Sequence, residues 1–259
     1  MCNSEIRQVE VKQKWDIGSQ NSGKELDWDP DSSPSAWKHY LKYTIPKLPD
    51  FIKSELLDEK FLERSDGYLR LPFVTNSVFG SMLGADTDFN FNQTTSKRKG
   101  KYNKHLSIVE DFLSKKRAPK GYTKDSILSL LSDCKNGHHT LENFSIMPVK
   151  TYHGMPSLNL YKGNKNVHDG HDRFDLYLKD IKEFYDAKSN IPVVCYNKKW
   201  FECFGDFYNY CSILYGIGSE LANEIIAHAY NAPKIETIYN VISYCELAKK
   251  YWSARKISL

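Results

Sequence analysis

The feature that most constrains the fold is an apolar stripe that begins at Phe174. Leu178, Ile181 and Tyr185 follow it at spacings of four, seven and eleven residues, which places all four side chains on one face of an α-helix. Lysine and acidic side chains occupy the positions between them. The pattern predicts an amphipathic helix of roughly four turns whose apolar face packs on a core.

The residues at the predicted start of this helix have two interpretations. Asp172 and Asp175 can accept hydrogen bonds from the free amides of the first turn and interact favourably with the helix dipole, so the motif can be a helix cap. The same helix start can instead bind an anion, with Arg173 as a planar donor. In that case Asn159 and Lys162 are candidate anion-binding residues beside it.

A short histidine-rich segment lies just before this helix. His168, Asp169 and His171 are residue types that bind divalent metals, and they surround Gly170. A metal site usually needs three or four ligands, and the sequence identifies no further one. A solvated glycine turn is the favoured interpretation, and the three residues are kept as metal candidates.

Length and composition exclude several classes of protein. A chain of 259 residues can bury a substantial core, and no apolar run is long enough to span a bilayer. The first residues lack the apolar segment of a signal peptide, and the six cysteines form no CxxC pair. We therefore expect a cytoplasmic protein with reduced cysteines and no membrane partner.

Positive charge is concentrated in one segment. Between Lys97 and Lys124 ten Lys or Arg face only two acidic residues, which gives this window +8 while the whole chain carries +4. Such asymmetry is typical of a surface that binds RNA or DNA, although a solvated insertion without a partner fits equally well. The candidate nucleic-acid-binding residues in this segment are Lys97, Arg98, Lys99, Lys101, Lys115, Lys116 and Arg117.

The order of predicted elements indicates an α+β fold. Strands are predicted near residues 68–74, 141–149 and 157–161, and the C-terminal half is mostly helical. We therefore expect the helices to pack on a small sheet from the middle of the chain. Residues 1–26 are predicted to be a poorly ordered lead-in, and residues 27–259 a single α+β domain with a basic insertion at about 96–124.

A glycine-containing turn near residue 217 resembles the helix-hairpin-helix motif. Gly216, Ile217 and Gly218 are followed at the expected spacing by Ala222 and Ile225, and in this motif the glycines let backbone amides approach a phosphate. Ser219 and Glu220 stand where nucleic-acid binders usually carry Lys or Arg. Because glycine-turned helix pairs are also common as plain structure, Gly216 and Gly218 are candidate nucleic-acid-binding residues with a structural alternative.

Several short segments together resemble a family of uncharacterised bacterial proteins. They are Asp29 to Pro34 with Tyr40 and Leu41, Asn159 to Gly163, Asp172 to Leu176, Phe204 to Phe207, and Ala254 to Ile257. The family pattern has Arg where this chain has Lys162. The resemblance implies a cytosolic bacterial protein of one compact domain and implies no activity.

Three functional hypotheses remain open from the sequence. The first is a nucleic-acid- or nucleotide-directed protein. One form of it is a phosphodiester-acting enzyme in which carboxylates bind Mg²⁺ or Mn²⁺ and Arg173 stabilises phosphate charge. The second is a non-enzymatic nucleic-acid-binding module, and the third is a protein-interaction module. The candidate catalytic residues of the first hypothesis are Asp172, Arg173, Asp175 and Asp206.

Overall fold

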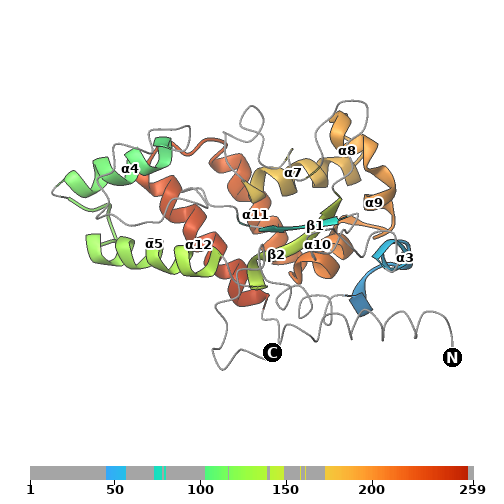
Figure 1. The fold of residues 1–259 in the computed structure, drawn as a ribbon. Coiled ribbons are helices and arrows are strands. Elements are labelled where there is room, and N and C mark those ends of the chain that lie inside the picture. The colour runs from blue at the N-terminus through green and yellow to red at the C-terminus, as the bar shows by residue number, and fades with distance from the viewer. Residues whose placement is uncertain are drawn as a thin grey trace, which may run out of the picture.

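The computed structural model describes residues 45–56, 73–77, 79, 103–115, 117–138, 141–148, 158, 161 and 173–255. Most of them are helical (Figure 1). The helices are α3 (Asp50–Leu56), α4 (Asn103–Ser114), α5 (Lys124–His138), α7 (Phe174–Tyr185), α8 (Pro192–Tyr196), α9 (Lys198–Glu202), α10 (Phe207–Tyr215), α11 (Ser219–Asn231) and α12 (Ile238–Ala254). Two short 3-10 turns are η2 (Ile45–Lys47) and η4 (Leu141–Asn143), and the strands are β1 (Phe73–Ser77) and β2 (Phe144–Pro148).

The predicted α+β fold class is wrong. β1 and β2 are five residues long and pair antiparallel, with Phe73 opposite Pro148 and Ser77 opposite Phe144. In the part of the chain that the structure describes, this ladder has no third strand. A two-strand ladder offers too little surface to underlie several helices, so the helices bury their apolar faces on one another. The described chain is a helical assembly that carries one short ladder.

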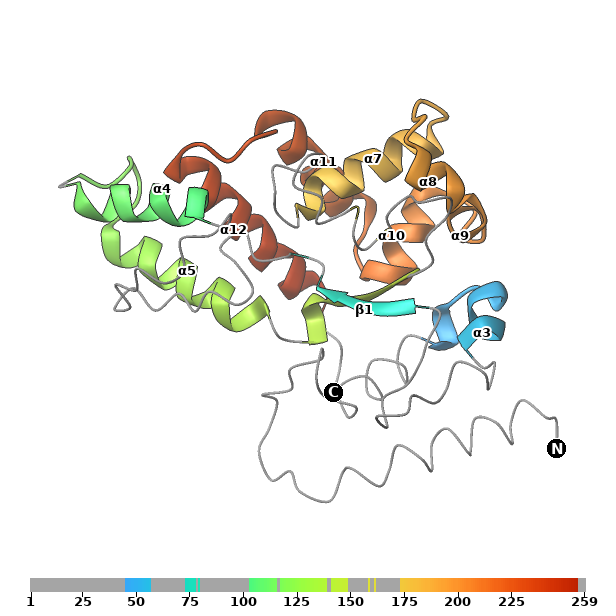
Figure 2. The same ribbon diagram turned by 45° about the horizontal axis from the view of Figure 1, so that its top comes forward.

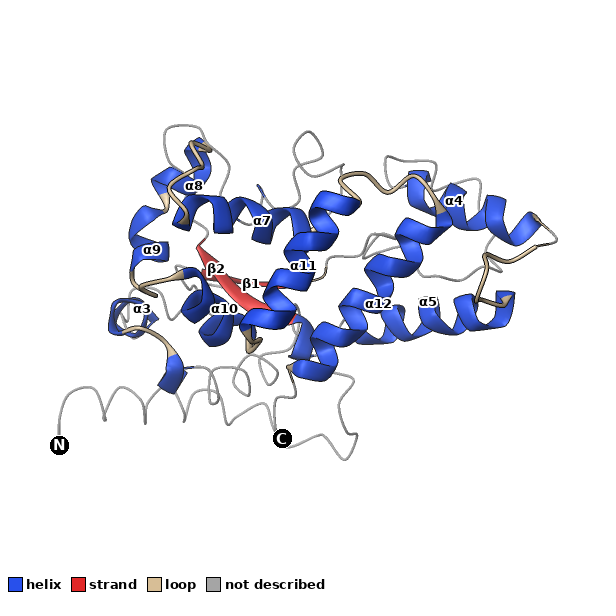
Figure 3. Cartoon of the chain, turned by 180° about the vertical axis from the view of Figure 1, so that it is seen from behind, coloured by secondary structure: helices blue, strands red, loops and turns tan. Residues whose placement is uncertain are grey.

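The helices form two neighbouring groups, one with α7, α8, α10 and α11 and the other with α4, α5 and α12. Figure 3 shows α11 between α7 and α12, and α11 contacts both of them. α4 and α5 pack against α12 at the end of the molecule away from α8 and α9, while β2 contacts α10 on one side of the helices (Figure 2). This arrangement brings the start of α7, the end of α11 and the first half of α12 together.

The apolar stripe predicted from the sequence forms the core face of α7. Phe174, Leu178 and Ile181 are buried, and Tyr185 is half-buried. The Phe174 ring meets the ring of Phe79 edge-on, with 5.2 Å between their centroids. The prediction of a core-facing helix is therefore confirmed.

Candidate functional site

The structure describes only part of the candidate site. Of the four candidate catalytic residues it describes Arg173, Asp175 and Asp206. The candidates that lie outside the described residues are Asp172, Asn159, Lys162, His168, Asp169, His171, Lys97, Arg98, Lys99, Lys101 and Lys116. Their roles stay predictions.

Arg173 and Asp175 form a fully buried ion pair. The guanidinium of Arg173 donates from Nε to Oδ1 of Asp175 at 2.8 Å and from Nη2 to Oδ2 at 2.6 Å, the forked geometry that favours arginine over lysine. Nη2 also donates to the carbonyl oxygen of Ala232 at 2.7 Å. Both side chains have no exposed surface, so a ligand in solvent does not reach either of them in this conformation.

Asp175 does not cap the helix as the sequence predicts. α7 has Arg173 at its N-cap position, and no side chain there accepts a first-turn amide. The carboxylate of Asp175 instead turns toward Arg173 and toward α11. The first-turn amide of Phe174 donates to the hydroxyl of Tyr244 at 3.2 Å. A residue of α12 thus satisfies a donor that the sequence assigns to a neighbouring aspartate.

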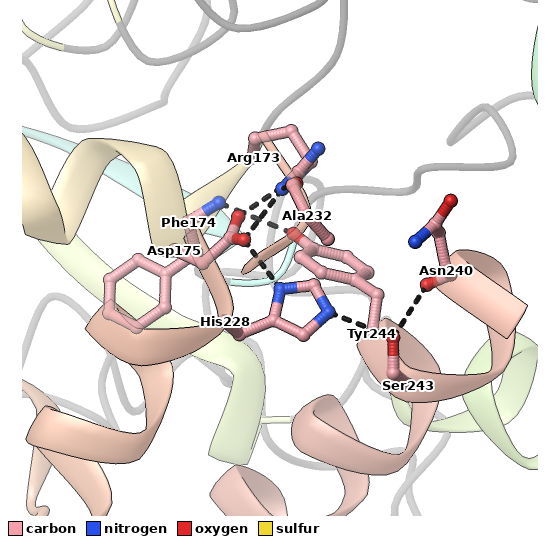
Figure 4. A network of polar contacts seen from close by, with 8 residues as sticks. All are labelled: Arg173, Phe174, Asp175, His228, Ala232, Asn240, Ser243 and Tyr244. Atoms are coloured by element: carbon pink, nitrogen blue, oxygen red, sulfur yellow. Dashed lines mark hydrogen bonds and ion pairs between the residues drawn. The ribbon is translucent and has the colours of Figure 1, made fainter. Parts of the chain in front are cut away.

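The network continues from Asp175 through α11 into α12 (Figure 4). Nδ1 of His228 lies 2.7 Å from Oδ2 of Asp175, and Nε2 lies 3.0 Å from Oγ of Ser243. Oγ of Ser243 is in turn 3.1 Å from the carbonyl oxygen of Asn240. Neutral His228 donates to Asp175 and accepts from Ser243, whereas charged His228 donates to both and Ser243 donates to Asn240. The network is hydrogen-bonded in either protonation state.

The pKa of Asp175 is set by two opposing effects. Burial alone raises the pKa of a carboxyl group because it disfavours the charged form. Hydrogen bonds and positive charge from Arg173, and the hydrogen bond from His228, outweigh burial and hold the pKa of Asp175 below its ordinary value of 3.8. Asp175 is therefore a carboxylate whose two oxygens already accept three donors.

The order of carboxylate, imidazole and hydroxyl is also that of a nucleophilic relay. Ser243, however, lies in the second turn of α12, where the backbone amides belong to the helix and cannot form an oxyanion hole. Arg173 also occupies both oxygens of Asp175. We interpret Arg173, Asp175, His228 and Ser243, called the buried junction below, as the polar contact that holds α7, α11 and α12 together.

Asp206 lies away from the buried junction and caps α10. Its Oδ1 accepts the amides of Tyr208 and Asn209 at 2.8 and 2.9 Å, and its Oδ2 accepts the side-chain amide of Asn209 at 2.8 Å. These are the contacts of a standard N-cap aspartate. None of these contacts joins Asp206 to Arg173 or Asp175.

The glycine hairpin, defined as Gly216, Ile217 and Gly218 between α10 and α11, is built as the sequence motif requires. Gly216 ends α10 in the left-handed conformation with φ 61°, which favours glycine. Ile217 is buried and anchors the turn, and Ala222 and Ile225 are fully buried on the inner side of α11. The two-helix geometry expected from the motif is therefore present.

Both glycines of the hairpin are exposed, and the start of α11 has no side-chain cap. Gly218 is the N-cap residue in an extended conformation, so the first amides of α11 point away from the helix without an intrahelical acceptor. A Cβ atom built on Gly218 meets no atom within 4 Å. The backbone there is open to close approach from outside.

A separate exposed feature, rich in positive charge, is the basic loop, defined as Lys115 to Lys124, which joins α4 to α5. It contains five Lys or Arg and no acidic residue. Lys115 pairs with Asp111, whereas Arg117 and Lys120 are exposed and form no ion pair with any described residue. Of the ten Lys and Arg in the predicted basic segment, five lie outside the described residues: Lys97, Arg98, Lys99, Lys101 and Lys116.

The sequence did not single out His228 and Ser243. His228 is 53 residues from Asp175, and Ser243 follows another 15 residues later, so no local spacing connects them. The one available signal was a histidine next to small and apolar residues of a predicted helix. That signal is weak, because it is shared by many structural histidines.

The described residues contain no group of three or more His, Cys, Asp or Glu side chains placed to hold a metal ion. Within the same ranges, none of the helices combines the length and apolar character that crossing a bilayer requires.

Comparison with known proteins gave one match. No curated protein and no solved structure matched the chain. The matching segment contains the basic loop, α7 and α10, whereas the family-like pieces near residues 29–41 and 254–257 lie outside it. Residues 93–215 match the model of a family of unknown function, DUF6994, which confirms the resemblance to an uncharacterised family over that part of the chain.

Proposed function

We propose that this protein is a nucleic-acid-binding module that holds a phosphate of a duplex backbone at the glycine hairpin. The observation that carries the proposal is the uncapped start of α11 next to two exposed glycines. Helix N-termini bind phosphate because free amides and the positive end of the helix dipole point at the ligand. Glycine at both ends of the turn removes the side chains that would otherwise keep a phosphate away.

The packing of the hairpin adds to this proposal. A phosphate site gains from a rigid arrangement of its amides, because an ordered site loses less entropy on binding. Ile217, Ala222 and Ile225 are almost completely buried and hold the turn against the core. The glycines are thus presented by a fixed turn.

The charge around the hairpin limits how strongly it can bind. Glu220 is exposed in the first turn of α11, and Glu224 one turn later is paired with Lys250. A carboxylate at Glu220 repels a phosphate at the same helix end. We therefore expect the glycine hairpin alone to bind weakly and the basic loop to supply much of the salt-sensitive attraction.

We propose binding rather than metal-dependent phosphodiester cleavage. Cleavage by a Mg²⁺ or Mn²⁺ site needs carboxylate oxygens that are open to the ion. The oxygens of Asp175 are occupied by Arg173 and His228, and those of Asp206 by the amides that it caps. Asp175 cannot bind a metal without giving up these contacts, and both oxygens of Asp206 already accept hydrogen bonds from the first turn of α10.

The test is a charge-reversal pair measured with a fluorescent blunt DNA duplex. Glu220→Lys removes the repulsion at the hairpin and should tighten binding about three-fold to ten-fold at low salt, with the gain shrinking as salt rises. Glu202→Lys changes the net charge equally but lies in α9, beyond the far end of α10. If the two variants tighten binding equally, the effect is one of net charge and the hairpin proposal is wrong.

A further inference from the structure

The basic loop is held in a defined shape at its tip. The amide of Tyr122 donates to the carbonyl oxygen of Pro119 at 3.1 Å, which closes a tight turn with Lys120 and Gly121 at its centre. Gly121 has φ 89°, the conformation that the third position of a type II turn needs. Lys120 is thereby fixed at the exposed corner of the loop.

An exposed aromatic ring from α12 stands beside this corner. The hydroxyl of Tyr239 accepts the amide of Lys120 at 3.3 Å, and the Tyr239 side chain is 54% exposed. Tyr239 lies in the first turn of α12, so the contact joins two segments that are 119 residues apart. The hydroxyl thus holds a large, half-exposed ring against the backbone of the basic loop, where the ring leaves apolar surface open to solvent.

Two acidic groups close to the loop are engaged by its own residues. Asp111 pairs with Lys115, and Glu246 accepts the hydroxyl of Tyr122 at 2.8 Å. Arg117 and Lys120 are exposed and have no such partner among the described residues. We call Arg117, Lys120 and Tyr239 the basic–aromatic patch.

The chemistry of this patch suits a single strand of nucleic acid better than a duplex. An unpaired base can stack on an exposed tyrosine ring while neighbouring cations contact the phosphates of the same strand. The bases of an intact duplex are stacked on one another and cannot reach a ring on a protein surface.

The patch lies at the opposite end of α12 from the glycine hairpin. Arg255, just after α12, approaches the hairpin so closely that its Cγ is 3.3 Å from a Cβ built on Gly216. Tyr239 and Arg255 are sixteen residues apart along the helix, and at 1.5 Å per residue the two sites are about 24 Å apart. That separation corresponds to about seven base pairs of duplex.

We propose that the two sites together recognise a junction between duplex and single-stranded nucleic acid, with the duplex backbone at the glycine hairpin and the unpaired strand stacked on Tyr239. This inference rests on the proposed duplex contact at the hairpin. It adds the class of substrate, since a blunt duplex has no unpaired base to stack on Tyr239, whereas a junction offers both a duplex backbone and an unpaired strand.

The experiment compares a blunt DNA duplex, the same duplex with an overhang of about ten thymidines on either strand, and the thymidine strand alone. One of the two overhang duplexes should bind about five-fold or more tightly than the blunt duplex. Tyr239→Ala should abolish this gain, and Tyr239→Phe, which keeps the ring and loses only the hydroxyl, should keep most of it. Tyr230→Ala, which removes another exposed ring, should leave the gain unchanged.

The outcomes separate the two proposals. Equal affinity for blunt and overhang duplexes, or a gain that survives Tyr239→Ala, overturns the junction inference and leaves duplex binding at the hairpin standing. Binding of the single strand that is lost in Tyr239→Ala, together with duplex binding that does not respond to Glu220→Lys, supports the patch and contradicts the hairpin. No binding of any probe overturns both. Thermal unfolding of each variant identifies any loss that comes from misfolding.

Discussion

Arg173 and Arg117 show how differently one residue type is used in this chain. Arg173 is fully buried at the start of α7, and its guanidinium donates to Asp175 and to the carbonyl of Ala232. Arg117 is exposed in the basic loop, where no acidic residue follows within the loop. The first arginine fixes the positions of helices, and the second exposes its charge to solvent.

The comparison shows that charge in a motif is not in itself a sign of chemistry. Arg173 and Asp175 lie at a helix start where the sequence suggests a binding site, yet the two side chains satisfy each other inside the protein. A buried ion pair of this kind is costly to break, because each partner left alone becomes an uncompensated buried charge. In the exposed loop Lys115 pairs with Asp111, whereas Arg117 and Lys120 form no ion pair with the described residues and face solvent.

The largest expected effect on stability comes from removing the buried guanidinium. We expect Arg173→Met to lower the free energy of unfolding by about 3–5 kcal/mol, since Asp175 is left charged and buried. Arg117→Met, the same change at an exposed site, should stay within about 0.5 kcal/mol. Urea unfolding of the two variants measures both values, and similar losses would contradict the difference in roles.

Acid unfolding tests the charge state of the buried junction. The pKa of Asp175 is lowered in the folded protein, so its ionisation stabilises the fold above pH 3.8 and that contribution is lost as pH falls through the folded pKa. Below pH 3.8 the free energy of unfolding should fall by up to about 1.4 kcal/mol per pH unit through this group. Asp175→Asn should remove this part of the slope. An unchanged slope in urea titrations over that range would count against a charged Asp175.

Serine substitutions at the two hairpin glycines should have opposite signs. Gly216→Ser places a Cβ in the left-handed region and against Arg255, which should cost about 1–2 kcal/mol. Gly218 has an ordinary φ of −78° and open space around it, and the hydroxyl of a serine there can cap α11. Gly218→Ser should therefore keep the stability or raise it by roughly a few tenths of a kcal/mol. Thermal unfolding distinguishes them, and equal losses would mean that the hairpin is not built as described.

The smallest expected effect concerns the outer end of the buried junction. Ser243→Ala removes the partner of Nε2 of His228, which is part-buried, and should cost about 0.5–1.5 kcal/mol. Ser212→Ala, at an exposed position of α10, serves as the control and should be close to neutral. If Ser243→Ala leaves the stability unchanged, Nε2 of His228 forms an equally good hydrogen bond with water.

The helical elements could be predicted because their signals are local. The stripe of Phe174, Leu178 and Ile181 becomes the buried face of α7, and the spacing from Gly216 to Ala222 becomes the packed hairpin of α10 and α11. In both cases the periodicity of apolar residues already fixes which side of the helix is buried.

The α+β class was wrong, and Asp175 does not accept first-turn amides as predicted, because both features depend on partners far away in the chain. The cap predicted at Asp172 lies outside the described residues. The extent of a sheet depends on how many strands pair, and β1 pairs with a strand about seventy residues later and with no third one in the described residues. Asp175 turns to His228, 53 residues away, although a local cap was available. Tertiary contacts thus override local preference at both places.

The measurement that tests the central claim most directly is duplex binding by Gly218→Asp, followed by fluorescence anisotropy at low and moderate salt. Aspartate is a strong N-cap residue, so it should keep or raise the melting temperature while placing a carboxylate on the amides proposed to hold phosphate. We predict an intact fold with affinity for a blunt duplex reduced about ten-fold or more. An intact variant that binds duplex as tightly as the unmodified protein would contradict phosphate binding at the glycine hairpin.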